Sequence, residues 1–331
     1  MKIALFSKNP SKFNSVFTDE VMIKIKSYGE VSSLINRSNL KEHKEFLKDC
    51  EYAFSTWGMP EFTKEEIKEY MPSLKAVFYA AGTVQYFARP FLECGVRIFS
   101  AFAANAVPVA EYTFAQISLA SKGYFQAAKK YRTLLPYAHA HANSAPGNYK
   151  CKVGLVGLGA IGQMVAERLS ALEVEVFACD PFIPEETAKR LGVTLVDMET
   201  LFTECDVISN HLANKPELKN IFNAKLFKKM KKNATFINTG RGAQVNEGAL
   251  ARSLWLHPSR TFVADVLKNE ICPVTSPLFW CHNVILTPHI AGSTGNEPQR
   301  MAYYMAQELD LILEGKPVRY EVTAESLARM A

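Results

Sequence analysis

The sequence predicts an α/β protein built from two doubly wound parallel sheets, each in its own domain. Over the first hundred residues short apolar runs alternate with helical patterns, and the same alternation starts again near residue 150 and continues to Ile285. At 331 residues the chain is also too long for one ordinary hydrophobic core. Such alternation is typical of parallel sheets that are covered by helices on both faces.

The first domain is predicted from the segments that precede Asn105. Its strand candidates are the apolar runs Lys2–Phe6, Glu30–Ile35, Tyr52–Thr56, Leu74–Tyr79 and Val96–Ser100. Between them, Asn39–Asp49 and Thr63–Tyr70 carry apolar residues at helical spacing, and Thr63 with Glu66 makes a capping box. This order predicts a small, doubly wound, flavodoxin-like sheet.

A long helix is expected to connect the two domains. It opens after Asn105, covers Val107–Leu135 and ends at Pro136, and the following stretch Tyr137–Asn148 is loop-like. A last helix, Glu297–Leu313, is expected to return to the first domain. We therefore expect a discontinuous first domain of residues 1–106 and 296–331 and a second domain of residues 107–295, with a cleft between them.

The motif VGLGAIG gives the second domain its chemistry. Its glycines follow the apolar run Cys151–Val156 and open the helical pattern Ile161–Leu172. In such a turn the glycines permit the tight bend, close approach to a pyrophosphate and close helix packing, and the helix N-terminus offers N–H groups to the phosphates. The pattern predicts a dinucleotide-binding Rossmann domain. The cofactor-binding residues expected in this turn are Gly157, Gly159, Ala160, Ile161 and Gly162.

Asp180 ends the next apolar run, Val174–Cys179. At this position a carboxylate accepts hydrogen bonds from the adenosine ribose, and its charge repels a 2′-phosphate. The alternative is a surface turn residue, because CDPF is also good turn sequence. The position after the glycine turn favours binding, and the predicted cofactor is NAD rather than NADP.

Composition excludes several classes of partner. The charge of +5 is spread along the chain, and the basic cluster Lys225–Lys232 has apolar residues at helical spacing. That cluster is interpreted as the solvated face of a helix rather than a nucleic-acid patch. No segment approaches the ~20 apolar residues needed to span a bilayer, and the N-terminus lacks a signal-like apolar run. We expect neither a nucleic-acid partner nor a membrane.

Cysteine and histidine usage points to a reduced, metal-free protein. The seven cysteines are scattered without a CxxC pair, which favours a cytoplasmic location. His139 and His141 would point the same way on a strand, but they lie in the loop-like stretch, and the other histidines lack partners at metal-ligand spacing. No metal site is predicted.

Three later segments carry a family resemblance. INTGRG (Ile237–Gly242), ADVLKNE (Ala264–Glu270) and LTPHIAGST (Leu286–Thr294) follow VGLGAIG in the order and spacing of the D-isomer-specific 2-hydroxyacid dehydrogenases. SLKAVFYAAG resembles the strand and loop on that family's substrate side, and ANAVPVAEYTFAQI resembles its interdomain helix. The resemblance covers most of the chain and implies that the first domain binds substrate and the second binds NAD.

The resemblance implies a catalytic trio of Arg241, Glu270 and His289. Physical chemistry supports these roles, because a guanidinium grips a 2-oxo acid's carboxylate through two parallel hydrogen bonds. Histidine titrates near neutral pH and can supply the proton that the reduced carbonyl needs, and a neighbouring carboxylate fixes its ring. Singly, each residue also fits a plain structural role in a turn, a polar stretch or a strand end.

Further contacts are implied by the same resemblance. Ala81 and Gly82 match the loop that holds the substrate carboxylate, together with Arg241, and a glycine there allows backbone to approach an anion. The remaining cofactor contacts expected are Asn210, His211, Thr239, Gly240, Asp265 and Gly292. His211 is equally compatible with a structural role, and Trp57 with either the cleft or the core.

The chain also departs from the family pattern. After His211 the usual Pro-Leu-Thr stretch and a later threonine are replaced by Ala213, Asn214, Lys215 and Leu218. Ala160 stands where an arginine is frequent, and Ile271 stands where a proline commonly follows the glutamate. The changes after His211 are expected to alter cofactor affinity or the course of that loop.

The leading hypothesis is an NAD-dependent dehydrogenase of a D-2-hydroxy acid, with a small-molecule 2-oxo or 2-hydroxy acid as substrate. The family's formate dehydrogenases resemble the pattern with glutamine at the position of Glu270, which argues against that activity. The second hypothesis is an NAD(H)-sensing, corepressor-like scaffold on the same fold. The resemblance also implies a homodimer through the cofactor domain, to which the arm Gly123–Asn148 would contribute.

Overall fold

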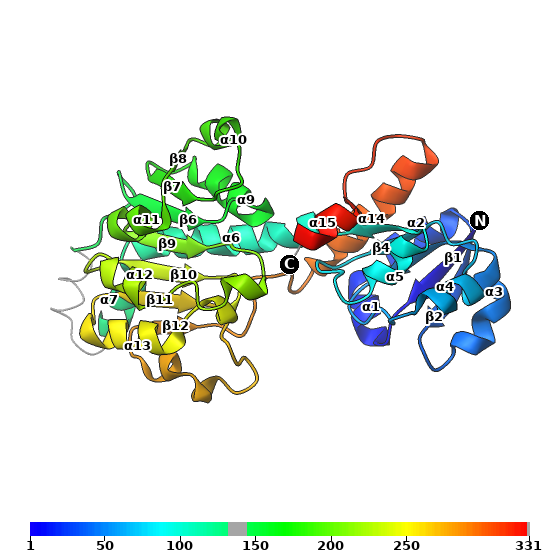
Figure 1. Ribbon diagram of the computed structural model, residues 1–331, viewed down its shortest axis with the longest axis horizontal. Coiled ribbons are helices and arrows are strands. Elements are labelled where there is room, and N and C mark those ends of the chain that lie inside the picture. Colours follow the sequence, from blue (N-terminus) through cyan, green and yellow to red (C-terminus); the bar gives the residue numbers. More distant parts are fainter. Residues whose placement is uncertain (132–143, 330–331) are drawn as a thin grey trace. The chain divides into compact units, whose positions relative to one another are not determined.

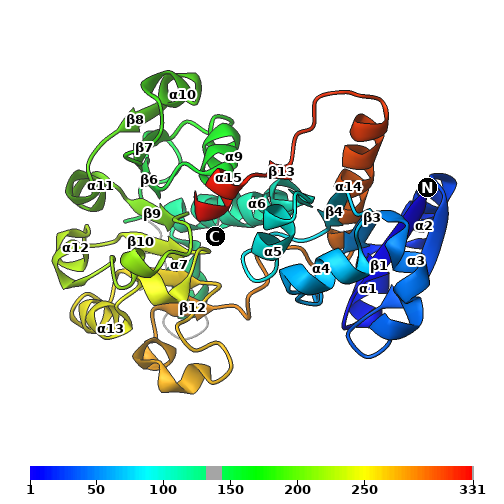
Figure 2. The same cartoon turned by 45° about the vertical axis from the view of Figure 1, so that its right-hand side comes forward.

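The computed structural model describes residues 1–131 and 144–329. The chain forms two compact units, and Figures 1 and 2 show a sheet flanked by helices in each. Unit 1 consists of Met1–Asn105 and Ser293–Ala331, and unit 2 consists of Ala106–Gly292. The expected loop Tyr137–Asn148, with His139 and His141, falls largely outside the described residues.

Unit 1 contains a six-stranded sheet within the described part of the chain, in the order β13-β5-β4-β3-β1-β2. Its strands are β1 (Lys2–Phe6), β2 (Glu30–Ile35), β3 (Cys50–Ser55), β4 (Ala76–Tyr79), β5 (Arg97–Ser100) and β13 (Glu321–Val322). All neighbours pair in parallel except β13, which pairs antiparallel with β5. The five parallel strands were predicted, whereas the two-residue β13 was not.

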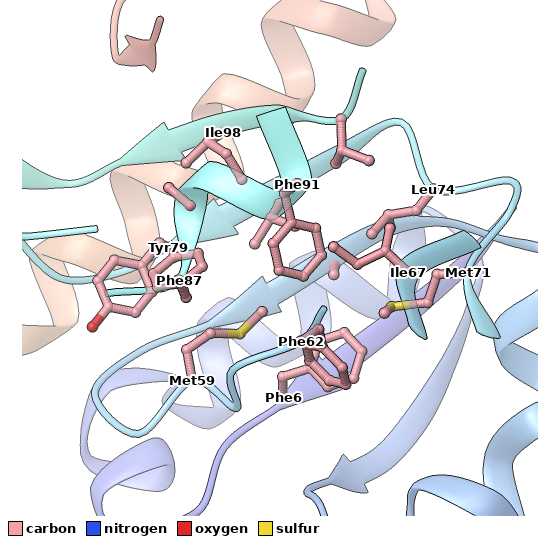
Figure 3. Packing of buried hydrophobic residues seen from close by; sticks show 14 of the residues in the cluster. Phe6, Met59, Phe62, Ile67, Met71, Leu74, Tyr79, Phe87, Phe91 and Ile98 are labelled. Atoms are coloured by element: carbon pink, nitrogen blue, oxygen red, sulfur yellow. The ribbon is translucent and has the colours of Figure 1, made fainter. Parts of the chain in front are cut away.

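Helices cover both faces of the unit 1 sheet. They are α1 (Pro10–Val16), α2 (Asp19–Ser27), α3 (Lys44–Lys48), α4 (Lys64–Tyr70), α5 (Ala88–Glu93), α14 (Pro298–Leu313) and α15 (Ala324–Arg329). On one face α1, α2 and α14 pack on alternate strand residues, and on the other α3, α4 and α5 do so. Figure 3 shows the second face, where Phe62 lies between Phe6 and Phe91 at ring-centroid distances of 5.4 and 5.9 Å.

Two helix predictions in unit 1 are tested by local geometry. The capping box at Thr63 is confirmed, because its hydroxyl accepts from the Glu66 amide and Glu66 accepts from the Thr63 amide. The helix expected over Asn39–Asp49 is wrong in part, because it starts as a 3₁₀ turn, η1 (Leu40–His43), before α3. The Asn39 side chain bonds the Asn36 amide and the Leu34 carbonyl, which anchors a turn instead of a helix start.

Unit 2 contains a seven-stranded sheet, counted over its described residues, in the order β12-β11-β10-β9-β6-β7-β8. The strands are β6 (Lys152–Val156), β7 (Glu175–Cys179), β8 (Val193–Leu195), β9 (Val207–Asn210), β10 (Thr235–Asn238), β11 (Thr261–Ala264) and β12 (Val284–Leu286). Every pair is parallel. Strand order reverses at β6, which lies between β9 and β7, as in a Rossmann sheet. The predicted fold class is confirmed.

Two layers of helices enclose this sheet. They are α6 (Phe102–Ser121), α7 (Tyr124–Tyr131), α9 (Ala160–Leu169), α10 (Glu185–Arg190), α11 (Met198–Glu204), α12 (Ala224–Lys229) and α13 (Glu247–Leu256). One face buries α11, α12 and α13 on alternate strand residues, and the other buries α6 and α9. Short 3₁₀ turns fill the connections: η2 (Pro216–Leu218), η3 (Gly242–Gln244), η4 (Pro273–Thr275) and η5 (Pro277–Trp280).

The single helix expected over Val107–Leu135 is wrong. The structure has α6, which starts earlier and accommodates Pro108, and then α7. Gly123 separates them in a left-handed conformation with φ of 65°, and its N–H donates to the Ala120 carbonyl. A glycine with positive φ commonly ends a helix. The apolar periodicity continues on both sides of Gly123, so it did not reveal the break.

No helix among the described residues is both long and apolar enough to cross a membrane. Over the same residues, no group of three or more histidine, cysteine or acidic side chains is arranged to hold a metal ion.

A buried guanidinium ties α12 to the sheet of unit 2. Arg260 is 3% exposed and makes no ion pair within residues 1–131 and 144–329. It donates to the carbonyls of Phe227 (2.9 Å), Met230 and Lys231 (3.0 Å) at the end of α12, and to the Ser253 hydroxyl (2.8 Å). Burial lowers the pKa of Arg260. The side chain therefore caps carbonyls that the helix end leaves without partners.

Replacing Arg260 with leucine should lower the free energy of unfolding by about 3 kcal/mol, because it leaves these buried acceptors unpaired. The control is Arg252→Leu on the exposed side of α13, which should change it by less than about 0.5 kcal/mol. Urea unfolding followed by circular dichroism measures both. Equal stability of the two variants would mean that the Arg260 contacts contribute nothing.

Candidate active site

The glycine turn joins β6 to α9 as the sequence predicted. Gly157 has φ of 92°, and a Cβ there would lie 3.0 Å from the His211 carbonyl oxygen. A Cβ on Gly162 would lie 2.1 Å from the Gly157 carbonyl oxygen, so only glycine lets α9 start this close to the turn. Around Gly159 the space is open, and among the described residues no side chain caps the N-terminus of α9. The exposed backbone donors at Gly159, Ala160 and Ile161 suit an anion.

Asp180 lies directly against this turn at the end of β7. One carboxylate oxygen accepts the Leu158 amide at 2.7 Å, and the other accepts the Phe182 amide at 2.8 Å. The second contact is the turn that CDPF suggested. The first contact joins Asp180 to the glycine turn. Asp180 is therefore a turn residue and also lies beside the expected cofactor-binding turn, so the two interpretations are compatible.

His211 follows β9 and packs behind the glycine turn. Both of its ring nitrogens are buried without a hydrogen-bond partner among the described residues, although the residue as a whole is partly exposed. Burial lowers the pKa of His211 to about 4. At neutral pH the ring is therefore uncharged.

Thr239, Gly240 and Arg241 form the loop after β10. The Thr239 hydroxyl is buried 3.1 Å from the Thr113 hydroxyl of α6. Arg241 has an extended backbone and is partly exposed, and its guanidinium donates to the Gly240 carbonyl at 2.9 Å. Within the described residues Arg241 makes no ion pair, which leaves its other donors for a ligand.

Glu270 and His289 come together from two different loops. Glu270 follows β11 and His289 follows β12, and the His289 Nδ1 lies 2.8 Å from the Glu270 Oε2. The side chains are 50% and 44% exposed for His289 and Glu270 respectively. A partly exposed imidazole oriented by a carboxylate can exchange a proton with a ligand.

Asp265 holds the loop that carries His289. Its side chain is 2% exposed, and its carboxylate accepts the Thr287 hydroxyl (2.6 Å) and the amides of Ile290 and Ala291 (2.8 Å each). The His289 amide donates to the Asp265 carbonyl at 3.0 Å. His289 has φ of 54°, which is rare for a residue other than glycine. These contacts with Asp265 offset the strain.

Sequence reasoning missed this anchoring role and two residues of α6. It assigned Asp265 to the cofactor, and that assignment stays a prediction. Tyr112, whose hydroxyl is 2.9 Å from the Thr287 hydroxyl, and Thr113 were not singled out. Burial raises the pKa of Tyr112. Gly292 is partly exposed at the end of unit 2. Tyr112 and Thr113 lie in an apolar helical pattern, and nothing in that pattern indicates which residues their hydroxyls contact.

Ala81 and Gly82 lie in unit 1, after β4. The buried Ser100 hydroxyl donates to the carbonyls of Ala81 (3.1 Å) and Gly82 (2.5 Å), which fixes the loop. The amides of Gly82 and Thr83 find no acceptor in the part of the chain that the structure describes. Trp57 is partly buried and packs against both apolar layers of unit 1, with the Lys12 ammonium 4.6 Å from its ring centroid.

Replacing Asp265 with asparagine should loosen residues 287–292. Asparagine keeps one acceptor oxygen but turns an NH₂ group toward the Ala291 amide. Two N–H donors then face each other where a buried hydrogen bond stood. Hydrogen exchange of the peptide that contains these residues should therefore become faster. The control Asp197→Asn retains its helix cap, because asparagine caps as well as aspartate. Unchanged exchange in the Asp265 variant would contradict the anchoring role.

Comparison with known proteins identifies the family. Residues 115–291 match the family model described as D-isomer specific 2-hydroxyacid dehydrogenase, NAD binding domain. The D-3-phosphoglycerate dehydrogenase of Synechocystis sp. is 38% identical over 180 residues, which are 54% of this chain and 32% of that protein. The matched region thus spans about a third of the length of this curated relative.

Solved structures share the whole fold. A phosphoglycerate oxidoreductase from Rhizobium etli matches with a TM-score of 0.81 at 21% identity, over 98% of both chains. The NAD-complexed D-isomer specific 2-hydroxyacid dehydrogenase of Lactobacillus delbrueckii ssp. bulgaricus matches with a TM-score of 0.76 at 22% identity, over 98% of this chain and 100% of its own. At such identities the likeness concerns the fold alone. By the family match, the chain belongs to the D-isomer specific 2-hydroxyacid dehydrogenases, and its unit 2 carries their NAD-binding domain.

Proposed function

We propose that this protein is an NAD-dependent oxidoreductase that moves a hydride between nicotinamide and a D-2-hydroxy acid or its 2-oxo acid. The observation that carries the proposal is the His289–Glu270 pair, 2.8 Å apart within a domain that matches the family's NAD-binding model. A carboxylate-oriented histidine supplies the proton that this reaction needs in addition to the hydride.

Arg241 binds the substrate in this proposal. A 2-oxo acid presents a carboxylate and a carbonyl side by side, and a guanidinium donates two parallel hydrogen bonds to such a group. As the carbonyl is reduced its oxygen gains negative charge, which the cation stabilises. The support is its placement: the Arg241 side chain is partly exposed, and within residues 1–131 and 144–329 the Gly240 carbonyl of its own loop is the only acceptor of its hydrogen bonds.

His289 acts as the proton donor in reduction and the acceptor in oxidation. With Glu270 bonded to Nδ1, the exchanged proton sits on Nε2. His289 would deliver this proton to the carbonyl oxygen of the oxo acid, and NADH, when bound, would supply the hydride for the carbonyl carbon, which together would give the 2-hydroxy acid and NAD⁺. Glu270 fixes the ring in one orientation.

NAD supplies the hydride chemistry when it is bound, and the chain binds and orients it. The open turn at Gly159 and the uncapped start of α9 fit a pyrophosphate, and Asp180 beside that turn fits the adenosine ribose. The neutral ring of His211, with unpartnered nitrogens, fits a contact to the cofactor. Asn210, Thr239, Gly240, Asp265 and Gly292 complete the proposed cofactor contacts.

Unit 1 has proposed substrate-binding residues of its own, Ala81 and Gly82. The amides of Gly82 and Thr83, which donate to nothing else in the described chain, would receive the substrate carboxylate next to Ala81. The Ser100 hydroxyl donates to the carbonyls of Ala81 and Gly82, so the loop can present its amides to an anion.

Assembly and location are further proposals. We infer a homodimer through unit 2, where Trp255, Leu256 and Trp280 are exposed by 62%, 67% and 68%. The arm Gly123–Asn148, also expected to take part, lies partly outside the described residues. All seven cysteines are free thiols, which suits the reducing cytoplasm. Sedimentation equilibrium tests the dimer.

The activity is tested by single-turnover oxidation of NADH with a panel of 2-oxo acids: glyoxylate, pyruvate, hydroxypyruvate and 3-phosphohydroxypyruvate. We expect at least one acid to be reduced to its D-2-hydroxy acid. Failure on every acid despite tight NADH binding would reject the enzyme and favour the NAD(H)-sensing scaffold.

Arg241→Ala and His289→Gln should fail in different ways. Loss of the guanidinium should raise KM for the oxo acid and also lower kcat, so that most of kcat/KM is lost while NADH affinity is nearly kept. Loss of the proton donor should lower kcat by about 10²–10⁴-fold while both ligands still bind. Steady-state kinetics and NADH fluorescence titration separate the two. Turnover retained in His289→Gln would reject its role, and parallel loss of NADH binding in Arg241→Ala would make that residue structural.

A further inference from the structure

Three amide side chains form a buried network at the carboxyl ends of two neighbouring strands of unit 2. Asn210 ends β9, Asn238 ends β10 and Gln244 ends η3, and they are 0%, 0% and 1% exposed. The Asn210 Nδ2 donates to the Asn238 Oδ1 at 2.8 Å and to the Gln244 Oε1 at 2.7 Å. Asn210 therefore lies at the centre of the network.

Backbone groups fix the orientation of each amide. The Asn210 Oδ1 accepts the Leu212 amide at 3.1 Å, and the Asn238 Oδ1 accepts the Gly240 amide at 3.1 Å. The Gln244 Nε2 donates to the carbonyls of Ala213 (2.8 Å) and Leu212 (3.3 Å). Turning over any of the three would face donor with donor or acceptor with acceptor, so the network has one arrangement.

The network holds the peptide groups of Arg241 from both sides. The Arg241 amide donates to the Gln244 Oε1 at 3.3 Å, and its carbonyl accepts from the Asn238 Nδ2 at 3.2 Å. The same Gln244 side chain holds the Leu212 and Ala213 carbonyls of the segment after His211. One side chain thus bonds both the loop after β9 and the loop after β10.

Packing leaves the network little freedom. A Cβ on Gly240 would lie 2.7 Å from the Asn210 Nδ2 and 3.2 Å from the Gln244 Oε1. The loop backbone therefore touches the amides directly, and movement of one loop displaces the other.

We propose that Gln244 is a positioning residue that fixes Arg241 and the segment 211–213 as one element. The proposal rests on the proposed function, in which Arg241 contacts substrate and His211, the first residue of the 211–213 segment, contacts NAD. Substrate binding and cofactor binding then depend on the same buried amide, without Gln244 touching either ligand. Only a side chain with both an acceptor and two donors can bridge the Arg241 amide and two carbonyls.

The test is Gln244→Leu, with Asn283→Leu as the matched control. Asn283 is another buried amide of unit 2, 3% exposed, whose Nδ2 donates to the carbonyls of Leu254 and Arg260 at 3.1 and 2.8 Å. Both variants lose a buried amide, but only the first loses contact with Arg241. We expect Gln244→Leu to raise both the Kd for NADH and the KM for the best 2-oxo acid of the panel about tenfold. Asn283→Leu should change neither.

Hydrogen exchange supplies a readout that needs no activity. In Gln244→Leu, peptides containing residues 211–214 and 239–243 should both exchange faster than in the control. In Gln244→Glu the Arg241 amide keeps an acceptor while the Leu212 and Ala213 carbonyls lose their donors, so only the 211–214 peptide should exchange faster.

The outcomes are distinct. The proposal would be overturned if Gln244→Leu made only one of the two peptides exchange faster, or weakened the binding of only one of the two ligands. Effects equal to those of Asn283→Leu would overturn it as well. A wild-type protein that reduces no 2-oxo acid would sink the proposed function instead, and exchange together with NADH binding would still decide the role of Gln244.

Discussion

The candidate site depends on one buried carboxylate, that of Asp265. A carboxylate removed from water is costly unless donors surround it, and here the donors come from the segment that carries His289. The same contacts keep His289 in a left-handed backbone conformation and so direct its ring toward Glu270. One set of hydrogen bonds therefore offsets both the desolvation free energy of the Asp265 carboxylate and the backbone strain at His289.

Parallel strand geometry explains why residues so distant in sequence share one region of unit 2. Asn210 ends β9. The other groups come just after the strands: the glycine turn follows β6, Arg241 follows β10, Glu270 follows β11 and His289 follows β12. Because all these strands run in one direction, their carboxyl ends lie along one edge of the sheet, where ligands of open α/β sheets bind. The buried amides between β9 and β10 then link neighbouring loops along that edge.

Features encoded in consecutive residues were predictable, and those set by tertiary contacts were not. The glycine turn, Asp180 and the strand runs follow from spacing and apolarity, and the His289–Glu270 contact was inferred from a family resemblance. The anchoring by Asp265 and the bonds of Gln244 arise between segments that no local pattern connects. Helix limits failed where a single residue decided them: Gly123 divides an apolar pattern, and Asn39 replaces a helix start with a turn.

The discontinuity of unit 1 has a consequence for biosynthesis. Met301 and Met305 of α14 are fully buried beneath the sheet, and β13 covers the edge at β5, yet both elements are translated after all of unit 2. At about 5–20 residues per second, the ribosome takes on the order of 10–40 s to pass through unit 2. During that interval α1 and α2 can pack on this face of the first sheet, but the part that α14 buries in the finished protein stays exposed. The contiguous unit 2 can complete its fold first, and the nascent first sheet is the region that a chaperone would shield.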